Sequence, residues 1–331
     1  MSPTNSNSTH PFAEPVGGVA VFSDLVPTLL FLLGFVALTI LNAIDCYKKQ
    51  RWTMMRFGLV FVPMERMVAL SFRTAACFSR DVRESWGMME YIQTTYSTSF
   101  HLISNEHLQI ALCALALATR EGMQYDEWLL EAKKRPQLIE SRAGERSLYR
   151  KWTGSTECVL VVAQSLQTAV AVLSAIPSFN AASGWIPITK FLLNLFSLFI
   201  VGGILAWIHR LKYVEMIHPV ARRRLELSAI IILIVPIYRA AVSFRTASTL
   251  TTSPPSALPT KIGFYFLHLL PELVCCILSY MTDYRNFFDT DIWGDRPRAR
   301  VEDGKHEISA FIRSLRYFVM PWKFPTLLMR G

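Results

Sequence analysis

Long uncharged runs alternate with short polar stretches along this chain, and the clearest run covers residues 191–208. All eighteen of its positions are uncharged, Lys190 precedes it, and His209 and Arg210 follow it. An α-helix rises about 1.5 Å per residue, so roughly 20 apolar residues cross a bilayer core of about 30 Å. A soluble domain seldom needs a helix that is apolar on every face. The run therefore predicts a transmembrane helix.

Six further runs have a similar pattern. The run at 57–78 is apolar overall but carries Glu65, Arg66 and Arg73, and the run at 100–119 has an uncharged part of only twelve residues. The predicted fold is all-α, a polytopic membrane bundle of seven transmembrane helices in one domain. We expect these helices at about 25–44, 57–78, 100–119, 158–176, 191–208, 227–244 and 262–282.

Lys and Arg residues concentrate in alternate loops between these helices. The loops at 45–56, 120–155, 209–226 and 283–331 hold most of them, whereas the other loops hold few. Basic loops stay in the cytoplasm, which predicts an N-outside, C-inside topology. Without a helix at 100–119, the basic loop at 120–155 would lie on the outer side and the charge pattern would fail.

Both ends of the chain lie outside the predicted bundle. Residues 1–20 are rich in Ser, Thr, Asn, Pro and Gly, and we expect a disordered extracellular or lumenal tail there. The cytoplasmic tail, 283–331, contains a basic amphipathic segment at 308–324. Its apolar residues recur at helical spacing, which predicts a helix that lies in the membrane interface or packs on the cytoplasmic ends of the bundle.

Two short signals point to covalent modification. Asn7 begins an Asn-X-Ser/Thr triplet, a glycosylation acceptor if the tail is lumenal. Cys46 lies beside Lys48 and Lys49 at a helix end and is a candidate palmitoylation site. The six cysteines have no metal-ligand spacing, so no metal site is predicted from them.

Composition agrees with a membrane protein. Of the 331 residues, 52% are hydrophobic and 18% are charged, and the mean hydropathy is +0.30. Soluble proteins are nearer to about 25% charged. The net charge of +9 is explained by basic loops that face anionic lipids of the inner leaflet, rather than by nucleic-acid binding. The sequence has no catalytic or nucleotide-binding motif, so no catalytic residue and no cofactor is predicted.

Charged side chains inside the predicted helices are the candidates for chemistry, because each costs about 2.5–3.5 kcal/mol to insert. One interpretation is interhelical ion pairs, with Glu272 beside Arg239 and Glu65 beside an arginine. The other is a polar cavity between the second, sixth and seventh helices that holds a lipid headgroup, a sterol hydroxyl or a proton relay. A metal site at His268 and Glu272 would have too few ligands. The polar cluster comprises Glu65, Arg66, Arg73, Tyr238, Arg239, His268 and Glu272.

Two stretches near the end of the predicted bundle carry a resemblance. They read IVPIYRAAVSFRTAS and, after a loop rich in Ser and Pro, YFLHLLPELVCCILSY. They resemble fungal seven-helix membrane proteins of unassigned activity and, more distantly, the lipid-translocating exporter-like (aminocholesterol-resistance) family. The resemblance implies that Arg239 and Glu272 match an arginine and an acid that recur in both groups. Glu65 and Arg73 resemble a further acid–arginine pair of the exporter-like family, although they are one residue further apart and the expected glycine is absent.

These observations predict a non-enzymatic integral membrane protein that binds or moves a lipid or another amphipathic small molecule. Its partners would be membrane lipids, including anionic inner-leaflet lipids at the basic loops and the C-terminal segment. The membrane would be the plasma membrane or the endoplasmic reticulum. One alternative is a membrane-embedded enzyme, an acid-catalysed cyclase or isomerase in which a protonated Glu65 or Glu272 is the acid. A third is a seven-helix receptor.

Overall fold

A computed structural model of the chain describes nine ranges of residues, and all of them lie in the first of two compact units, residues 1–295. The glycosylation triplet at Asn7 and the amphipathic segment 308–324 lie outside the described residues. The backbone is described at Cys46, within a helix, but not its side chain. The described ranges are 12–13, 16–18, 20–48, 57–118, 155–156, 158–173, 184–210, 219–247 and 257–287.

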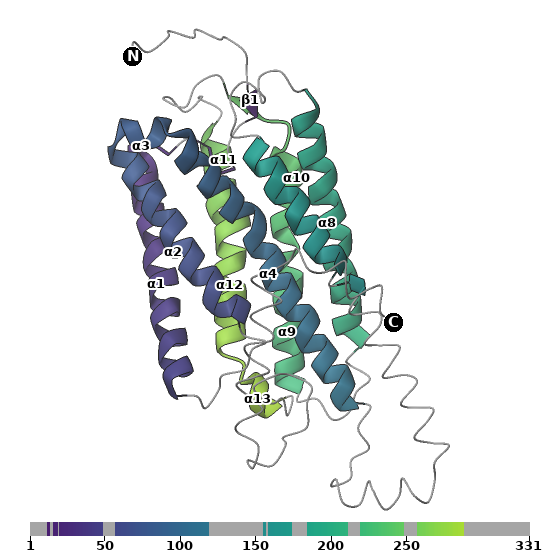
Figure 1. The fold of residues 1–331 in the computed structure, drawn as a ribbon. Helices are drawn as coiled ribbons and strands as arrows, with labels where there is room; N and C mark the ends of the chain where they lie inside the picture. The colour runs from purple at the N-terminus through teal and green to yellow at the C-terminus, as the bar shows by residue number, and fades with distance from the viewer. Residues whose placement is uncertain are drawn as a thin grey trace, which may run out of the picture. The chain divides into compact units, whose positions relative to one another are not determined.

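The described part of the first unit is a bundle of helices that run side by side (Figure 1). The predicted all-α class is confirmed for these residues. Three short helices, η1 (Phe22–Asp24), α3 (Arg80–Glu84) and α13 (Tyr284–Phe287), lie at the ends of the long ones. The remaining helical elements are α1 (Leu25–Lys48), α2 (Phe57–Phe78), α4 (Trp86–Ala118), a helix at Cys158–Leu173, α8 (Trp185–Arg210), α9 (Pro219–Ile232), α10 (Ile234–Val242), α11 (Ala257–Phe264), η4 (Tyr265–Leu269) and α12 (Leu270–Tyr280).

Four helical segments in the described ranges are long and apolar enough to cross a membrane. A fifth helix, Cys158–Leu173, is apolar but shorter. α2 has sufficient length but carries three charged residues, and the first half of α4 is polar. The chain is therefore an integral membrane protein by length and composition of its helices. The four segments are Phe22–Asp45, Trp185–His209, Pro219–Val242 and Leu258–Tyr280.

α4 differs most from the prediction. It begins at Trp86, whereas the sequence pattern predicted a loop at 80–99 and a helix only from residue 100. Its first half is rich in Ser and Thr, whose hydroxyls donate to the carbonyls of the preceding turn: Ser97 to Gln93 at 2.7 Å, and Ser104 to Phe100 at 2.7 Å. These bonds satisfy the polar side chains without leaving the helix. The polar face of this segment is buried in the bundle. A prediction that searches for apolar runs therefore does not detect it as a helix.

Prolines account for two irregularities in the later helices. The predicted helix at 227–244 is two helices, α9 and α10, which meet at Leu233. Pro236 has no N–H to donate to the carbonyl of Ile232, which interrupts the helix at this point. The predicted helix at 262–282 contains a π-helical turn, η4, immediately before Pro271. This proline removes the bond to the carbonyl of Leu267, and the wider turn accommodates it.

Part of the N-terminal tail is ordered against the bundle, contrary to the prediction for residues 1–20. β1 (Phe12–Ala13) pairs in antiparallel fashion with β2 (Thr246–Ala247), and Phe12 lies opposite Ala247. Gly17 and Gly18 follow with positive φ angles of 84° and 66°, a conformation that glycine adopts without strain. The tail therefore reaches the ends of the helices before η1 begins.

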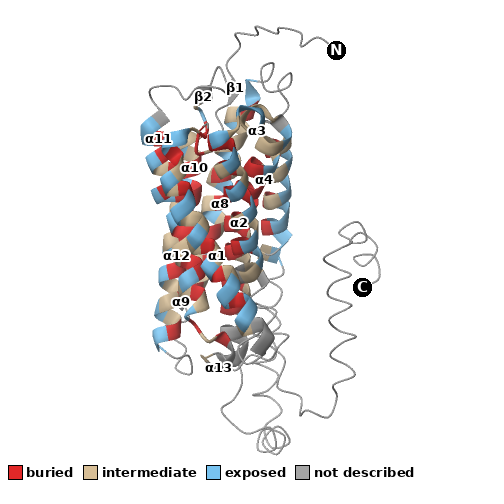
Figure 2. Ribbon diagram, turned by 90° about the vertical axis from the view of Figure 1, so that its left-hand side faces the viewer, coloured by how far each residue is buried: buried red, intermediate tan, exposed pale blue. Residues whose placement is uncertain are grey.

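Exposed residues cover the outside of the bundle and buried residues lie inside it (Figure 2). Many of the exposed side chains are large and apolar, and many of the buried ones are polar. Leu30 of α1, Phe199 of α8 and Phe266 of η4 are each more than 60% exposed. Exposed apolar surface of this extent is costly in water and favourable in lipid. The polar interior includes Arg66 and Glu272, which are both completely buried. A lipid environment explains both features.

Candidate functional site

The centre of the bundle holds a buried ion pair between α2 and α12. Arg66 donates from Nε to Glu272 Oε2 at 2.6 Å and from Nη2 to Glu272 Oε1 at 2.8 Å. Both side chains are 0% exposed. Two parallel bonds between a guanidinium and a carboxylate form the strongest geometry available to such a pair. The predicted pairing of Glu272 with Arg239 is wrong, because Arg66 occupies both carboxylate oxygens.

α4 supplies the remaining contacts of this pair. Ser99 donates from Oγ to Glu272 Oε1 at 2.7 Å and also contacts Arg66 Nη2. The ring of Tyr96 lies under the Arg66 guanidinium, with 4.6 Å between Cζ and the ring centroid. Neither residue was a predicted site residue, because the sequence pattern placed both in a loop. A signal was present: residues 88–118 contain no Gly and no Pro, which is unusual for a loop.

Arg239 of α10 binds α4 instead of an acid. It donates from Nη1 to the Tyr96 carbonyl and from Nη2 to Ser97 Oγ at 2.9 Å. Its Nε is buried and has no hydrogen-bond partner among the described residues. Its guanidinium lies 5.6 Å from the centroid of the Phe100 ring. This cation is thus buried with neutral partners only, within the part of the chain that the structure describes.

His268 lies on the π-helical turn, in an aromatic environment. Its ring contacts Phe264 and Tyr96 at centroid distances of 5.6 Å each, and Tyr238 at 6.2 Å. Neither ring nitrogen has a hydrogen-bond partner in the described ranges, and the side chain is 0% exposed. Glu272, four residues further along, bonds to Arg66 and Ser99. The described residues contain no group of three His, Cys, Asp or Glu side chains that could hold a metal ion.

Glu65 precedes Arg66 but points toward α4. Thr98 donates to its Oε1 at 3.5 Å, which is the limit for a hydrogen bond, and Oε2 has no partner among residues of known placement. The ion pair between Glu65 and an arginine, which the first interpretation of the polar cluster predicted, is therefore not formed within the described residues.

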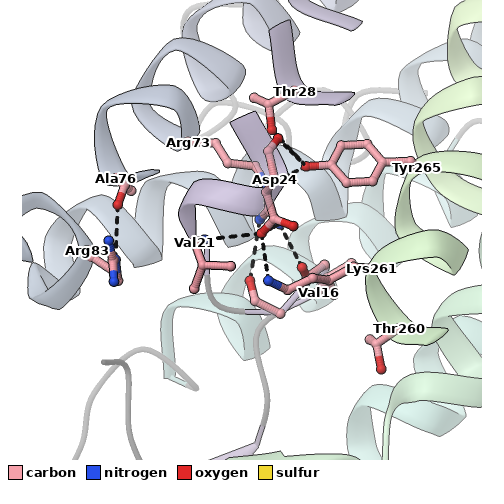
Figure 3. Close-up of polar contacts among 12 residues, drawn as sticks. Val16, Val21, Asp24, Thr28, Arg73, Ala76, Arg83, Thr260, Lys261 and Tyr265 are labelled. Atoms are coloured by element: carbon pink, nitrogen blue, oxygen red, sulfur yellow. Dashed lines mark hydrogen bonds and ion pairs between the residues drawn. The ribbon is translucent and has the colours of Figure 1, made fainter. Parts of the chain in front are cut away.

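Arg73 belongs to a second polar cluster, the Asp24 cluster, at the end of the bundle near residues 16–18 (Figure 3). Asp24 Oδ2 lies 2.8 Å from Lys261 Nζ and 3.5 Å from Arg73 Nη2. Arg73 also donates to the Gly17 carbonyl at 2.7 Å and to the Gly18 carbonyl at 3.4 Å. The cluster thereby binds the ordered part of the tail to α1, α2 and α11.

Two hydroxyls complete the Asp24 cluster. The Tyr265 and Thr28 hydroxyls share a hydrogen bond of 2.7 Å, and Arg73 Nε donates to the Tyr265 hydroxyl at 3.4 Å. Asp24 and Lys261 were not predicted as site residues, because they lie at helix ends, where charges are common. The predicted cluster therefore divides into an Arg66–Glu272 pair, an Arg239 site and the Asp24 cluster.

A pocket lies beside Arg239, which we name the α8–α10 pocket. Its cavity volume is about 30 Å³, and part of it is open to the surroundings. Its polar lining comes from α4 (Gln93, Ser97), from Gln167, from α8 (Lys190, Asn194), from Arg239 of α10 and from Ser243, which follows α10. The apolar lining includes Val170, Leu193 and Val242, and Val16 of the N-terminal segment lies at its edge. Arg66 and Glu272, from the second and seventh predicted helices, form a buried pair where a polar cavity was predicted, whereas the pocket is lined by residues of α4, α8 and α10.

The N-terminal segment is attached at the edge of this pocket through a pair of hydrogen bonds. The Val16 backbone N–H donates to Gln93 Oε1 at 2.9 Å, and Gln93 Nε2 donates to the Val16 carbonyl at 3.4 Å. An amide side chain that matches a backbone amide in this way holds the segment in one register.

Comparison with known protein families, with curated proteins and with solved structures finds no match for this chain.

Proposed function

We propose that this chain is a multi-pass membrane protein that binds or moves a lipid or another amphipathic molecule, without chemistry of its own. The observation that carries the proposal is the α8–α10 pocket, in which Lys190 and Arg239 lie beside aliphatic side chains. A site with one polar end and one apolar wall matches a molecule of the same character. An ionisable side chain buried inside a membrane bundle is by default a candidate binding site.

The proposal includes seven transmembrane helices with an N-outside, C-inside topology. It adds α2, α4 and the helix at Cys158–Leu173 to the four clear segments. The lengths of α2 and α4, 22 and 33 residues, are sufficient to cross a bilayer. Burial of Arg66 and Arg73 inside the bundle removes the main objection to α2, because neither charge faces lipid. In this topology the pocket, which has Val16 at its edge, lies toward the outer leaflet.

The membrane would be the plasma membrane or the endoplasmic reticulum, and the basic loops would face anionic inner-leaflet lipids. The resemblance to the lipid-translocating exporter-like family and to fungal seven-helix proteins supports a lipid ligand.

A test of the proposal compares two neighbouring leucines of α8. Leu193 lines the pocket, whereas Leu192 is 56% exposed on the lipid-facing surface. The full chain is purified in a mild detergent, and the lipid that it retains is measured by native mass spectrometry. We expect one or a few retained molecules per chain, lost in Leu193→Trp and kept in Leu192→Trp. Equal retention by both variants would contradict a ligand in this pocket.

One observation keeps a membrane-embedded enzyme as a second candidate. Glu272 is a poor general acid, because its two oxygens accept three hydrogen bonds. Glu65, in contrast, has an oxygen without a partner in the described ranges, so it is the remaining candidate for a protonated acid. Untargeted lipid analysis of a deletion strain separates the two functions: an altered lipid distribution supports transport, and a missing product supports the enzyme.

A further inference from the structure

The α8–α10 pocket contains two cationic side chains and no anionic one. Among the residues that line it, Lys190 and Arg239 are basic, and none is Asp or Glu. The nearby buried acids have other partners: Glu272 binds Arg66, and Asp24 binds Arg73 and Lys261. No ion pair of Lys190 or Arg239 is formed within the described residues. The lining of the pocket therefore carries two basic side chains and no acidic partner of its own.

The positive charge of these side chains is costly unless a ligand compensates it. Arg239 is 7% exposed, and its Nε has no hydrogen-bond partner in the part of the chain that is described. Withdrawal of a cation from water costs several kcal/mol, and neutral hydrogen-bond partners recover only part of that cost. An anion in the pocket would recover much more, because hydrogen bonds between ionised groups are about twice as strong as neutral ones.

The neutral polar side chains near Lys190 and Arg239 form a hydrogen-bond network with one another. Gln167 Nε2 donates to Ser197 Oγ at 2.9 Å and to Asn194 Oδ1 at 3.4 Å. Asn194 Nδ2 donates to the Lys190 carbonyl at 2.8 Å and to Ser243 Oγ at 3.4 Å. This network fixes the lining before a ligand arrives, which reduces the entropy lost on binding.

We propose that the α8–α10 pocket binds the anionic headgroup, a phosphate or a carboxylate, of a lipid, with Lys190 and Arg239 as its counter-ions. This inference rests on the proposed function and adds the sign of the headgroup and the residues that recognise it. The pocket takes only the charged group, and the aliphatic side chains of Val170, Leu193 and Val242 form the apolar part of its lining. A sterol hydroxyl or a zwitterionic headgroup fits less well, because neither brings a net negative charge to the two basic side chains.

The experiment uses the full chain in nanodiscs of phosphatidylcholine. Phosphatidylglycerol with the same acyl chains is titrated in, and bound lipid is counted by native mass spectrometry. Inorganic phosphate is the probe in a parallel series that follows thermal unfolding. The variants are Lys190→Gln, Arg239→Gln and the charge-conserving Lys190→Arg. Arg223→Gln is the control, because Arg223 is an exposed arginine of α9 that does not line the pocket.

We expect Lys190→Gln to weaken phosphatidylglycerol binding by about ten- to a hundredfold, since it removes a charged hydrogen-bond donor. Lys190→Arg should retain most of the binding, and Arg223→Gln all of it. Lys190 makes no side-chain bond within the described residues, so this variant should fold even where Arg239→Gln does not. Another outcome is that inorganic phosphate stabilises the chain, that Lys190→Gln abolishes this effect, and that phosphatidylglycerol is not preferred over phosphatidylcholine. The pocket would then bind a soluble anion, and the proposed lipid headgroup would be wrong.

Two negative outcomes are distinguishable. If phosphatidylcholine and phosphatidylglycerol bind equally and Lys190→Gln changes neither, the anionic headgroup is overturned while the proposed lipid-binding function stands. If no lipid of either kind is retained by the folded chain, the proposed function itself fails.

Discussion

Arg66 and Glu272 are 206 residues apart in the chain and form an ion pair of two parallel hydrogen bonds, completely shielded from the surroundings. The pair joins α2 to α12, and Ser99 of α4 bonds to the same carboxylate. Three helices that are distant in sequence are therefore held at one point.

The first prediction is that Glu272→Gln destabilises the protein by about 3–5 kcal/mol, because it leaves the Arg66 cation buried without a counter-ion. Thermal unfolding of the purified full chain measures the loss. The double variant with Arg66→Met should recover a large part of it, since the uncompensated charge is then removed.

Arg239→Gln, combined with Glu272→Gln in the same way, is the control for the Arg66→Met double variant. Arg239 has no hydrogen bond to Glu272 in the structure, so its combination with Glu272→Gln should be close to additive. Recovery of stability by Arg239→Gln, and not by Arg66→Met, would show that the ion pair has been assigned to the wrong arginine.

The second prediction concerns the Asp24 cluster. Asp24→Asn leaves two cations, Arg73 and Lys261, without their common acid, and we expect the ordered N-terminal segment to loosen. Hydrogen exchange of residues 20–24 should accelerate, because the Val21 N–H donates to Asp24 Oδ2 at 3.2 Å. Glu84→Gln is the matched control: it removes the Arg80–Glu84 pair, whose side chains are 76% and 38% exposed. That change should leave the hydrogen exchange of residues 20–24 unaltered, because an exposed pair contributes little to stability.

The third prediction uses glycine. Gly17 has φ = 84°, and a Cβ placed there would lie 2.8 Å from Cγ of the Phe264 ring. Gly17→Ala should therefore cost about 1–2 kcal/mol for the left-handed backbone alone, plus the displacement of the ring. The melting temperature of the full chain is the measurement.

Gly87→Ala is the control, because Gly87 lies in α4 and a Cβ there meets no heavy atom within 4 Å. Alanine in a helix is favoured over glycine by about 1 kcal/mol, so this variant should be neutral or slightly more stable. Equal losses in both variants would mean that residues 16–18 are not bound to the bundle as described.

The fourth prediction is topological. Seven transmembrane helices place the two ends of the chain on opposite sides, whereas the four clear segments alone would place them on the same side. Protease protection with epitope tags at both ends distinguishes these cases. We expect the N-terminal tag outside, with Asn7 glycosylated, and the C-terminal tag in the cytoplasm. Protection of both tags on one side would exclude an odd number of crossings.

The positions of helices that are mostly apolar could be predicted well from the sequence. α2 begins and ends at the predicted residues, and α1 begins at the predicted Leu25. Arg66 and Arg73 are seven residues apart, a spacing that brings two side chains to one side of a helix, and both are buried. α4 was misplaced because its polar face is also its buried face, which reverses the usual relation between polarity and exposure.

The partners of the buried charges could not be predicted from the sequence. Helical spacing shows which residues share a face of one helix, but not which helix that face contacts. Glu272 was equally compatible with Arg239 and Arg66 on the sequence alone, whereas in the structure it binds Arg66 and Arg239 bonds to α4. The pocket was missed for a similar reason: Lys190 precedes a predicted helix and resembles an ordinary flanking lysine.

The π-helical turn at Tyr265–Leu269 sets the phase between the two polar clusters. Tyr265, at the start of this turn, faces Arg73 and Thr28, while Glu272, one turn after it, faces Arg66. A π-helical turn bonds five residues back rather than four, so it takes up one more residue than an α-helical turn over the same rotation. Deletion of one residue within Tyr265–Leu269 would therefore leave a regular α-helix in which Glu272 still faces Arg66. Insertion of one further residue would instead rotate Glu272 by about 100°, away from Arg66.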